Sequence, residues 1–266
     1  MNVAAVQLDI AWEDKAANFA SVRKLLADAP PAPGSLIVLP EMFASGFSMN
    51  LAATRQTDAR EDENFLAALA REHRSIVAGG VVSPVENGRG RNESVVFSAG
   101  GELLARYAKI HPFSLGGEAD AHEAGREIVT FDCAGFTAAL FVCYDLRFPE
   151  IFRAAAKRGA NLFIVIALWP TKRQQHWLTL LQARAIENQA YVIGVNRVGN
   201  EPQFTYAGRS VVIEPHGVII ADAGEQERVL GTAIDLPTVE DWRRDFPALR
   251  DAHWKDNAEG SGPAAL

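Results

Sequence analysis

The stretch Phe141-Val142-Cys143-Tyr144-Asp145-Leu146-Arg147-Phe148-Pro149-Glu150 changes from a strand pattern to a helix pattern. The apolar run 138–142 predicts a buried strand that ends at Cys143. Pro149 and Glu150 are typical of a first helical turn, where proline is tolerated and a carboxylate favours the helix dipole. A thiol near such a helix start is close to amides that lower its pKa and bind an oxyanion. The stretch therefore predicts a nucleophilic cysteine, with a buried structural cysteine as the alternative.

Composition and charge exclude several classes of protein. The chain has 266 residues, of which 48% are hydrophobic and 22% charged, as in a soluble globular protein. The net charge is −7 and no segment is rich in lysine or arginine, so we expect no nucleic-acid partner. No apolar run approaches the ~18 residues that span a membrane, and the N-terminus does not resemble a signal peptide. We therefore expect no membrane association.

The cysteine and histidine content gives no sign of a disulfide framework or a metal site. Only Cys133 and Cys143 occur, near the ends of neighbouring predicted strands. Free thiols in a reducing, cytoplasmic setting are the simplest interpretation. The cysteine spacing fits no zinc pattern and the 6 histidines form no cluster of ligands, so we expect neither a metal nor a cofactor.

Strands and helices alternate along the chain, and hairpins interrupt the alternation. The predicted strands are residues 3–8, 36–39, 76–82, 94–97, 103–107, 128–131, 136–142, 162–168, 191–195, 210–213, 218–221 and 229–234. The predicted helices are residues 14–27, 63–71, 149–159 and 174–189. This order predicts one α/β domain over residues 1–240, with a mixed sheet or a pair of sheets. Residues 241–266 are expected to form a C-terminal extension that packs at a dimer interface or is partly disordered, and the end from Ala258 onward is expected to be loose.

Three reactive side chains share a position at the ends of predicted strands. Glu41, Lys109 and Cys143 each follow a different strand. In α/β sheets, ligand sites gather at the carboxyl ends of the strands, so we expect these side chains to meet. A carboxylate can act as a general base, an ammonium can stabilise an oxyanion and a thiol can act as a nucleophile.

These three residues lie in segments that resemble the signature blocks of the nitrilase, or carbon–nitrogen hydrolase, superfamily. The segments are Leu39-Pro40-Glu41-Met42-Phe43, Tyr107-Ala108-Lys109-Ile110-His111-Pro112-Phe113 and the stretch Cys143 to Glu150. The resemblance covers roughly residues 3–236. It implies a four-layer α-β-β-α sandwich that usually pairs into a homodimer. It also implies that Glu41 is the general base, that Lys109 stabilises the oxyanion and that Cys143 is the nucleophile.

Many members of this superfamily carry a second glutamate in the loop after the lysine block. Glu118, in Gly116-Gly117-Glu118-Ala119, matches that position best. Glu123 is the competing assignment, and Glu127 is a weaker one. The chain departs from the usual block at Pro112, where leucine is common.

Other segments resemble the omega-amidase branch of the superfamily. They are Gly46-Phe47-Ser48-Met49, Trp169-Pro170, His176-Trp177, residues 183–189 and Asn196-Arg197-Val198-Gly199. This resemblance implies hydrolysis of the terminal amide of 2-oxo-dicarboxylic acid monoamides, namely 2-oxoglutaramate, 2-oxosuccinamate or the amide of methionine salvage. One alternative is another amidase of the superfamily, acting on deaminated glutathione, N-carbamoyl compounds or aliphatic amides. The other is a non-catalytic binding protein of the same fold.

Four further residues are expected to contact the substrate. Tyr144 offers its backbone amide to the oxyanion, and Trp169 follows a strand at the same sheet edge as the nucleophile. Phe47 lies in an apolar stretch, where an aromatic residue lines a pocket or fills the core. Arg147 is a candidate for binding the substrate's carboxylate, and an ion pair with Glu150 is the alternative.

Overall fold

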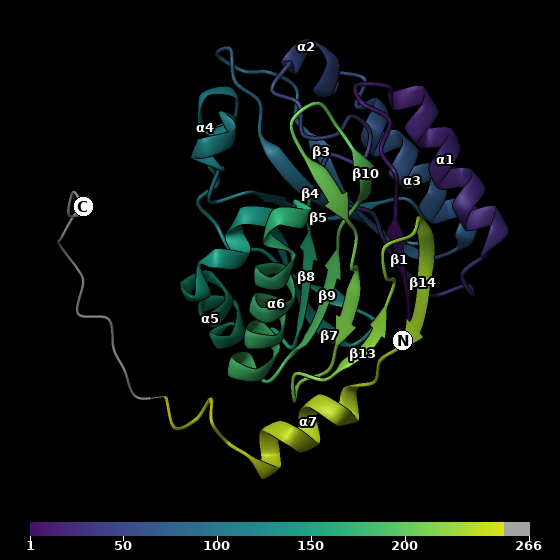
Figure 1. Cartoon of the computed structure of the whole chain (residues 1–266). Helices are drawn as coiled ribbons and strands as arrows, with labels where there is room; N and C mark the ends of the chain where they lie inside the picture. Colours follow the sequence, from purple (N-terminus) through teal and green to yellow (C-terminus); the bar gives the residue numbers. More distant parts are fainter. Residues whose placement is uncertain (253–266) are drawn as a thin grey trace, which may run out of the picture.

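The computed structural model of the protein describes residues 1–252, in which two six-stranded sheets pack face to face between two layers of helices (Figure 1). Helices α1 (Lys15–Asp28) and α3 (Glu61–His73) cover the first sheet. Helices α5 (Pro149–Lys157) and α6 (Gln174–Asn188) cover the second. This is the four-layer α-β-β-α sandwich predicted from the sequence.

The first sheet has the strand order β14-β1-β2-β3-β4-β5. Strands β1, β2 and β3 are parallel, and the remaining pairs are antiparallel. The strands are β1 (Asn2–Gln7), β2 (Leu36–Val38), β3 (Ile76–Val82), β4 (Asn92–Phe97), β5 (Leu103–Ala108) and β14 (Arg228–Ala233).

The second sheet has the order β13-β12-β9-β8-β7-β6, with β7, β8 and β9 parallel and the other pairs antiparallel. Its strands are β6 (Thr130–Cys133), β7 (Phe136–Val142), β8 (Leu162–Ile166), β9 (Tyr191–Val195), β12 (Val211–Ile213) and β13 (Ile219–Asp222). Strands β10 (Val198–Asn200) and β11 (Thr205–Ala207) form a separate hairpin.

The side chains of each central strand point alternately to two faces of the sheet, and both faces are buried. This explains why the predicted strands are continuous apolar runs. In β1, Val3 and Ala5 belong to the core between the sheets, whereas Ala4 and Val6 belong to the core beneath helices α1 and α3. Successive side chains of a strand point to opposite faces, and here both faces are covered. Each central strand is therefore apolar throughout.

The structure confirms the predicted long helices and the strands of both sheets, with ends shifted by a few residues. The side chain of Asp14 accepts a hydrogen bond from the amide of Ala17, as expected for the cap of α1. The β10–β11 hairpin and the short helices α2 (Leu51–Thr54) and α4 (Glu118–Ala121) are not predicted by the sequence pattern. These elements are too short to show a periodic apolar pattern.

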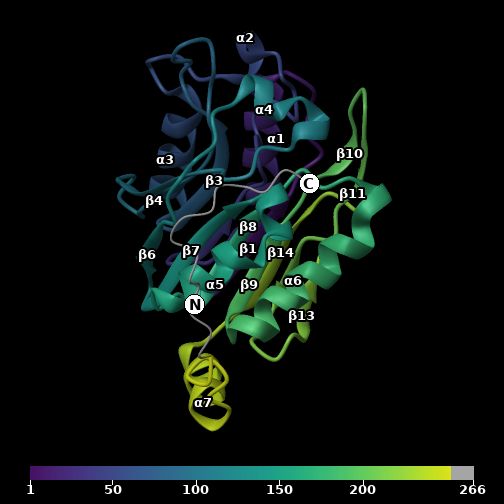
Figure 2. The same ribbon diagram turned by 90° about the vertical axis from the view of Figure 1, so that its left-hand side faces the viewer.

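Helix α7 (Leu236–Asp245) was also missed, because Val239 is its one buried residue among those described and the segment reads as polar. The helix lies below the two sheets (Figure 2). Arg243 fixes it by donating to the carbonyl groups of Ala160 and Asn188. The predicted domain boundary at residue 240 lies within α7, and the division of the chain at that point stays a prediction. The end from Ala258 onward, which was expected to be loose, lies outside the described residues.

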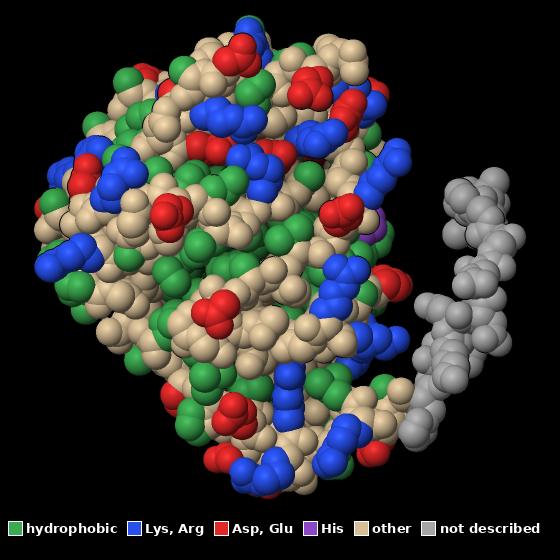
Figure 3. All heavy atoms as spheres, turned by 180° about the vertical axis from the view of Figure 1, so that it is seen from behind, with side chains coloured by type: hydrophobic (Ala, Val, Ile, Leu, Met, Phe, Trp, Pro, Cys, Tyr) green, Lys and Arg blue, Asp and Glu red, His purple; other side chains and the backbone are tan. Residues whose placement is uncertain are grey.

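Two observations describe the helices and the surface charge of the protein. Within residues 1–252, no helix is long and apolar enough to cross a bilayer. Acidic and basic side chains are interspersed on the face shown in Figure 3. That face therefore carries mixed charge instead of a field of one sign.

Candidate active site

Glu41, Lys109 and Cys143 meet where strands β2, β5 and β7 end, at the interface between the two sheets. Nζ of Lys109 lies 2.9 Å from Oε1 of Glu41, and the backbone of Leu168 links Glu41 to Cys143, because its amide donates to Glu41 and its carbonyl oxygen lies 3.8 Å from Sγ. All three side chains are buried. The structure thus brings together the three residues that the strand pattern placed at one sheet edge.

Three donors hold the Glu41 carboxylate. Oε1 accepts from Lys109 at 2.9 Å and from Nδ2 of Asn92 at 2.6 Å, and Oε2 accepts from the Leu168 amide at 2.8 Å. Strand β3 passes so close that a Cβ atom at Gly80 would lie 2.5 Å from Cα of Glu41. Only glycine fits there, so the close packing of β3 helps to fix the carboxylate.

Glu118 is the glutamate of the following loop that reaches this cluster. Its carboxylate lies 2.7 and 3.0 Å from Nζ of Lys109 and accepts from Nδ2 of Asn92 and the Phe113 amide, each at 2.7 Å. Gly117 directs the chain into α4 with a φ of +73°, a conformation that favours glycine. Burial would raise the pKa of Glu118, but Lys109 and these hydrogen bonds lower it.

The two competing glutamates do not reach the cluster. Glu123 forms an ion pair with Arg91, with 3.2 Å between Oε2 and Nη2. Glu127 is exposed. The sequence left open which of Glu118, Glu123 and Glu127 lies at the site. Of these three glutamates, only Glu118 contacts Lys109.

Lys109 remains charged although it is only 1% exposed. Burial acts to lower the pKa of Lys109, but the carboxylates of Glu118 and Glu41 outweigh burial and raise that pKa. An ammonium group held in this way offers a fixed positive charge beside the thiol.

The surroundings of Cys143 raise the pKa of its thiol. Burial and the negative charge of Glu41 raise the pKa of this thiol well above its ordinary value, and Lys109 offsets them only in part. The expectation that helix-start amides lower this pKa is therefore wrong, because α5 begins only at Pro149, after a 3₁₀ turn over Cys143–Arg147. Cys143 therefore needs a base, and Glu41 is the carboxylate whose charge acts most strongly on its thiol.

Cys143 also has an unusual backbone conformation. Its φ is +49°, which is uncommon for a residue with a Cβ atom. Sγ lies 3.8 Å from the carbonyl oxygen of Leu168. Strained residues of this kind persist only where the surrounding structure holds them, and they cluster at functional sites.

A pocket opens beside Cys143. The four residues expected to contact the substrate, Phe47, Tyr144, Arg147 and Trp169, all border it. The remaining lining residues are Phe113, Leu168, Pro170, Arg173, Phe204 and Tyr206. Of these, Arg173, Phe204 and Tyr206 were not identified from the sequence, because they come from a 3₁₀ turn and a short hairpin without a motif.

Buried polar contacts fix the walls of the pocket. Asn196 holds the backbone of Trp169 by accepting from its amide at 2.8 Å and donating to its carbonyl at 3.0 Å. In the β10–β11 hairpin, Glu201 accepts from the hydroxyl of Tyr206 and, at 3.1 Å, from Nη1 of Arg197. The hairpin that carries Phe204 and Tyr206 is thereby tied to the sheet.

Arg147 lies at the rim of the pocket and does not pair with Glu150 in the described part of the chain. Its guanidinium carbon lies 4.9 Å from the centre of the Trp169 ring, and Nη2 lies 3.3 Å from Nδ1 of His176. Since neither contact neutralises its charge with a carboxylate, Arg147 can bind an anionic group.

Asn92 is a site residue that the sequence analysis missed. It begins β4 and donates to both Glu41 and Glu118 through Nδ2. The predicted strand began at Ser94, and an asparagine ahead of a strand carries no motif. Only its pairing register with the neighbouring strands places Asn92 at the cluster.

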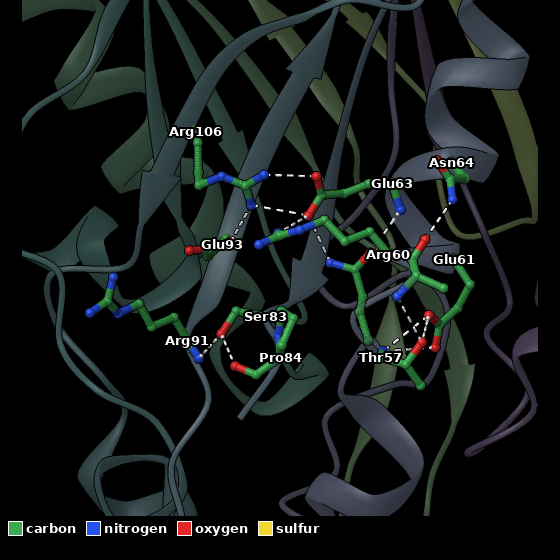
Figure 4. A network of polar contacts seen from close by, with 12 residues as sticks. Thr57, Arg60, Glu61, Glu63, Asn64, Ser83, Pro84, Arg91, Glu93 and Arg106 are labelled. Atoms are coloured by element: carbon green, nitrogen blue, oxygen red, sulfur yellow. Dashed lines mark hydrogen bonds and ion pairs between the residues drawn. The ribbon is translucent and has the colours of Figure 1, made fainter. Parts of the chain in front are cut away.

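A second charge cluster lies away from the pocket (Figure 4). Arg106 donates to Glu93 at 2.5 Å and to Oε2 of Glu63 at 2.7 Å, and Arg60 also contacts Glu63, at 2.8 Å. Arg106 and Glu93 border a polar surface groove that shares no lining residue with the pocket. We call this group the Arg106 cluster, and the group of Glu41, Asn92, Lys109 and Glu118 the Lys109 cluster.

Comparison with known proteins shows similarity over nearly the whole chain. The family described as carbon-nitrogen hydrolase matches residues 2–244. The 2-oxoglutaramate amidase of Bacillus subtilis (strain 168) is 31% identical over 250 residues, which cover 94% of this chain and 96% of that protein. Omega-amidase YafV of Escherichia coli (strain K12) is 36% identical over 255 residues, which cover 95% and 96%.

A solved structure agrees with the fold described above. XC1258 from Xanthomonas campestris, a CN-hydrolase superfamily protein with an arsenic adduct in its active site, superimposes with a TM-score of 0.88. It is 33% identical, and the match covers 96% of this chain and 98% of that one.

Proposed function

Because this chain belongs to the carbon–nitrogen hydrolase family, we propose that it is an omega-amidase. It would hydrolyse the terminal amide of a 2-oxo-dicarboxylic acid monoamide, namely 2-oxoglutaramate, 2-oxosuccinamate or the methionine-salvage amide, to the acid and ammonia. The similar proteins named omega-amidase and 2-oxoglutaramate amidase support this substrate class. The observation that carries the proposal is a buried thiol beside two carboxylates and an ammonium, at the floor of a pocket with Arg147 at its rim.

In the first half of the proposed reaction, Glu41 takes the proton of the Cys143 thiol and the sulfur attacks the amide carbon. Lys109 and the backbone amide of Tyr144 stabilise the oxyanion that forms. The carbon–nitrogen bond then breaks while the Glu41 carboxyl group returns the proton to the leaving nitrogen. Ammonia departs and a thioester on Cys143 remains. The raised pKa of the thiol supports the need for this base.

In the second half, a water molecule attacks the thioester carbon and gives a proton to Glu41. The carbon–sulfur bond breaks, the thiolate regains the proton and the acid is released. Glu118 is proposed to position the attacking water and Lys109. Its fixed orientation supports this role, because Lys109, Asn92 and the Phe113 amide all hold its carboxylate.

We also propose that the protein is a homodimer that acts in the cytoplasm. The exposed apolar side chains of Ile186 and Val218 support a dimer, since Ile186 lies beside Gly217 and the two side chains belong to one surface region. Two free cysteines support a reducing compartment.

Ammonia release from 2-oxoglutaramate, compared with deaminated glutathione, N-carbamoyl and aliphatic amides, tests the proposed substrate. We expect the highest kcat/KM for a 2-oxo acid amide. Cys143→Ala should abolish turnover with an unchanged circular dichroism spectrum, whereas the matched variant Cys133→Ala should retain it, because Cys133 lies in the core away from the pocket. Wild-type protein that releases no ammonia from any 2-oxo acid amide would refute the proposal, as would normal turnover by Cys143→Ala.

A further inference from the structure

The pocket has a marked separation of charge between its floor and its rim. The Lys109 cluster lies beneath the floor of the pocket, beside Cys143, and holds two carboxyl groups and one ammonium group. Among the described residues that line the pocket, Arg147 and Arg173 carry charge, and no acidic side chain is present. The other lining residues are mostly aromatic. An anionic group on a substrate is therefore repelled from the floor and attracted to the rim.

Arg173 is held in place at this rim by its own backbone and by an aromatic neighbour. It ends the 3₁₀ turn Thr171–Arg173, and its carbonyl oxygen accepts from Nε1 of Trp169 at 2.8 Å. The guanidinium carbon lies 5.5 Å from the centre of the Phe113 ring. No carboxylate of the described residues forms an ion pair with Arg173, so its charge remains available to a ligand.

The two arginines lie on neighbouring walls of the pocket. Arg147 lies 4.9 Å from the Trp169 ring and 5.9 Å from the Tyr144 ring. The guanidinium group of Arg173 lies over the Phe113 ring, and that ring lies 5.0 Å from the Tyr144 ring. Both guanidinium groups therefore border the same pocket, on walls that adjoin through the Tyr144 and Phe113 rings.

We propose that Arg173 is a specificity-determining residue which, together with Arg147, binds the carboxylate of an amide substrate and so selects anionic over neutral amides. The planar fork of arginine can donate two parallel hydrogen bonds to one carboxylate, which the ammonium of lysine cannot do. The carboxylate then lies at the rim while the amide faces Cys143. This inference rests on the proposed function, because it assigns the far end of the same substrate.

A pair of amides that differ only at the far end tests the inference. These are 2-oxoglutaramate and 4-oxopentanamide, in which a methyl group replaces the carboxylate. Arg173→Ala should lower kcat/KM for 2-oxoglutaramate by about 10–100-fold, mainly through KM, as expected for the loss of one partner of a hydrogen-bonded charge pair. Its kcat/KM for 4-oxopentanamide should equal that of wild type. Arg173→Lys should fall between wild type and Arg173→Ala on the anionic amide.

The adjacent Lys172 provides the matched control. It is exposed and does not line the pocket, so Lys172→Ala removes one positive charge without changing the rim. Lys172→Ala should behave as wild type on both amides. If Lys172→Ala lost as much kcat/KM on 2-oxoglutaramate as Arg173→Ala, the total positive charge near the pocket would explain the preference. That result would overturn the inference.

Other outcomes separate this inference from the proposed function. Equal losses on both amides in Arg173→Ala would indicate a structural role and overturn the inference alone. Wild-type preference for 2-oxoglutaramate that survives in Arg173→Ala would do the same, and the proposed function would stand. Wild-type protein that hydrolyses neither amide would overturn both.

Discussion

Strands β4 and β5 carry two charge clusters on opposite faces of one sheet, and only one of them can do chemistry. Asn92 and Glu93 are consecutive, so their side chains point to opposite faces. Asn92 belongs to the Lys109 cluster, and Glu93 belongs to the Arg106 cluster. Each cluster places one cation between two carboxylates.

The two clusters differ in burial and in the geometry of the cation. Lys109 is 1% exposed and lies beside the Cys143 thiol, whereas Arg106 is 28% exposed and borders a surface groove. The guanidinium fork of Arg106 is rigid and is committed to Glu63 and Glu93. The ammonium of Lys109 has three donors on a flexible stem and can turn one toward a new oxyanion. A cation between two carboxylates therefore stabilises the sheet on one face, where Arg60 adds a second cation, and lies beside a thiol on the other.

Removing the cation from each cluster should give the largest difference in kcat between a variant of the Lys109 cluster and a variant of the Arg106 cluster. Lys109→Met is expected to lower kcat by at least ~10²–10³, because the oxyanion loses a donor. Arg106→Met is expected to leave kcat unchanged and to lower the free energy of unfolding by ~1–3 kcal/mol, since charged hydrogen bonds are lost. Ammonia release and thermal unfolding by circular dichroism measure the two effects. Equal losses of kcat in both folded variants would contradict this assignment.

Single substitutions at two adjacent residues of β4, one in each cluster, should give a smaller difference in kcat. Asn92→Asp replaces the donor shared by Glu41 and Glu118 with a third negative charge, and kcat is expected to fall by ~10–100-fold, the equivalent of ~1.5–3 kcal/mol. Glu93→Gln is the matched control on the opposite face and should keep the wild-type kcat. Steady-state kinetics on 2-oxoglutaramate report both values. An Asn92→Asp variant as active as Glu93→Gln would remove Asn92 from the site.

The pH dependence of thiol labelling should show the charge balance around Cys143. Burial and Glu41 raise the pKa of this thiol, so below that pKa each unit of pH should increase the thiolate and the rate of alkylation by about tenfold. The rate constant for iodoacetamide between pH 7 and 9, followed by mass spectrometry, measures this rise. A rate that is already constant at neutral pH would show a thiolate in the resting enzyme. Cys133 should react far more slowly, because its side chain is fully buried in the core and does not border the pocket.

Much of the fold was predictable because the central strands are buried on both faces. Runs such as 36–39 and 136–142 are continuously apolar, which is a strong local signal. Glu41 and Cys143 follow such strands, and Lys109 follows the partly exposed strand β5. The ends of these strands, from two sheets that pack face to face, meet at one site. Local pattern and tertiary structure agree for these residues.

The remaining site residues depend on tertiary contacts that leave no local pattern. Asn92 reaches the cluster only through its pairing register, and Arg173 reaches the rim through a 3₁₀ turn. The pKa of the Cys143 thiol depends on burial and on Glu41, which is distant in sequence. The local signal of a helix start gave the wrong direction for that pKa, because burial and the negative charge of Glu41 raise it.

The β10–β11 hairpin has a consequence for how substrate preference can evolve in this protein. It supplies Phe204 and Tyr206 to the pocket wall, and its strands pair with each other in a separate two-stranded sheet. No residue of the hairpin belongs to the Lys109 cluster. Insertions or substitutions in this loop can therefore reshape the pocket while the reacting groups stay fixed. The hairpin is a natural unit for directed evolution, in which a library of loop sequences would change the choice of acyl group and preserve the hydrolytic machinery.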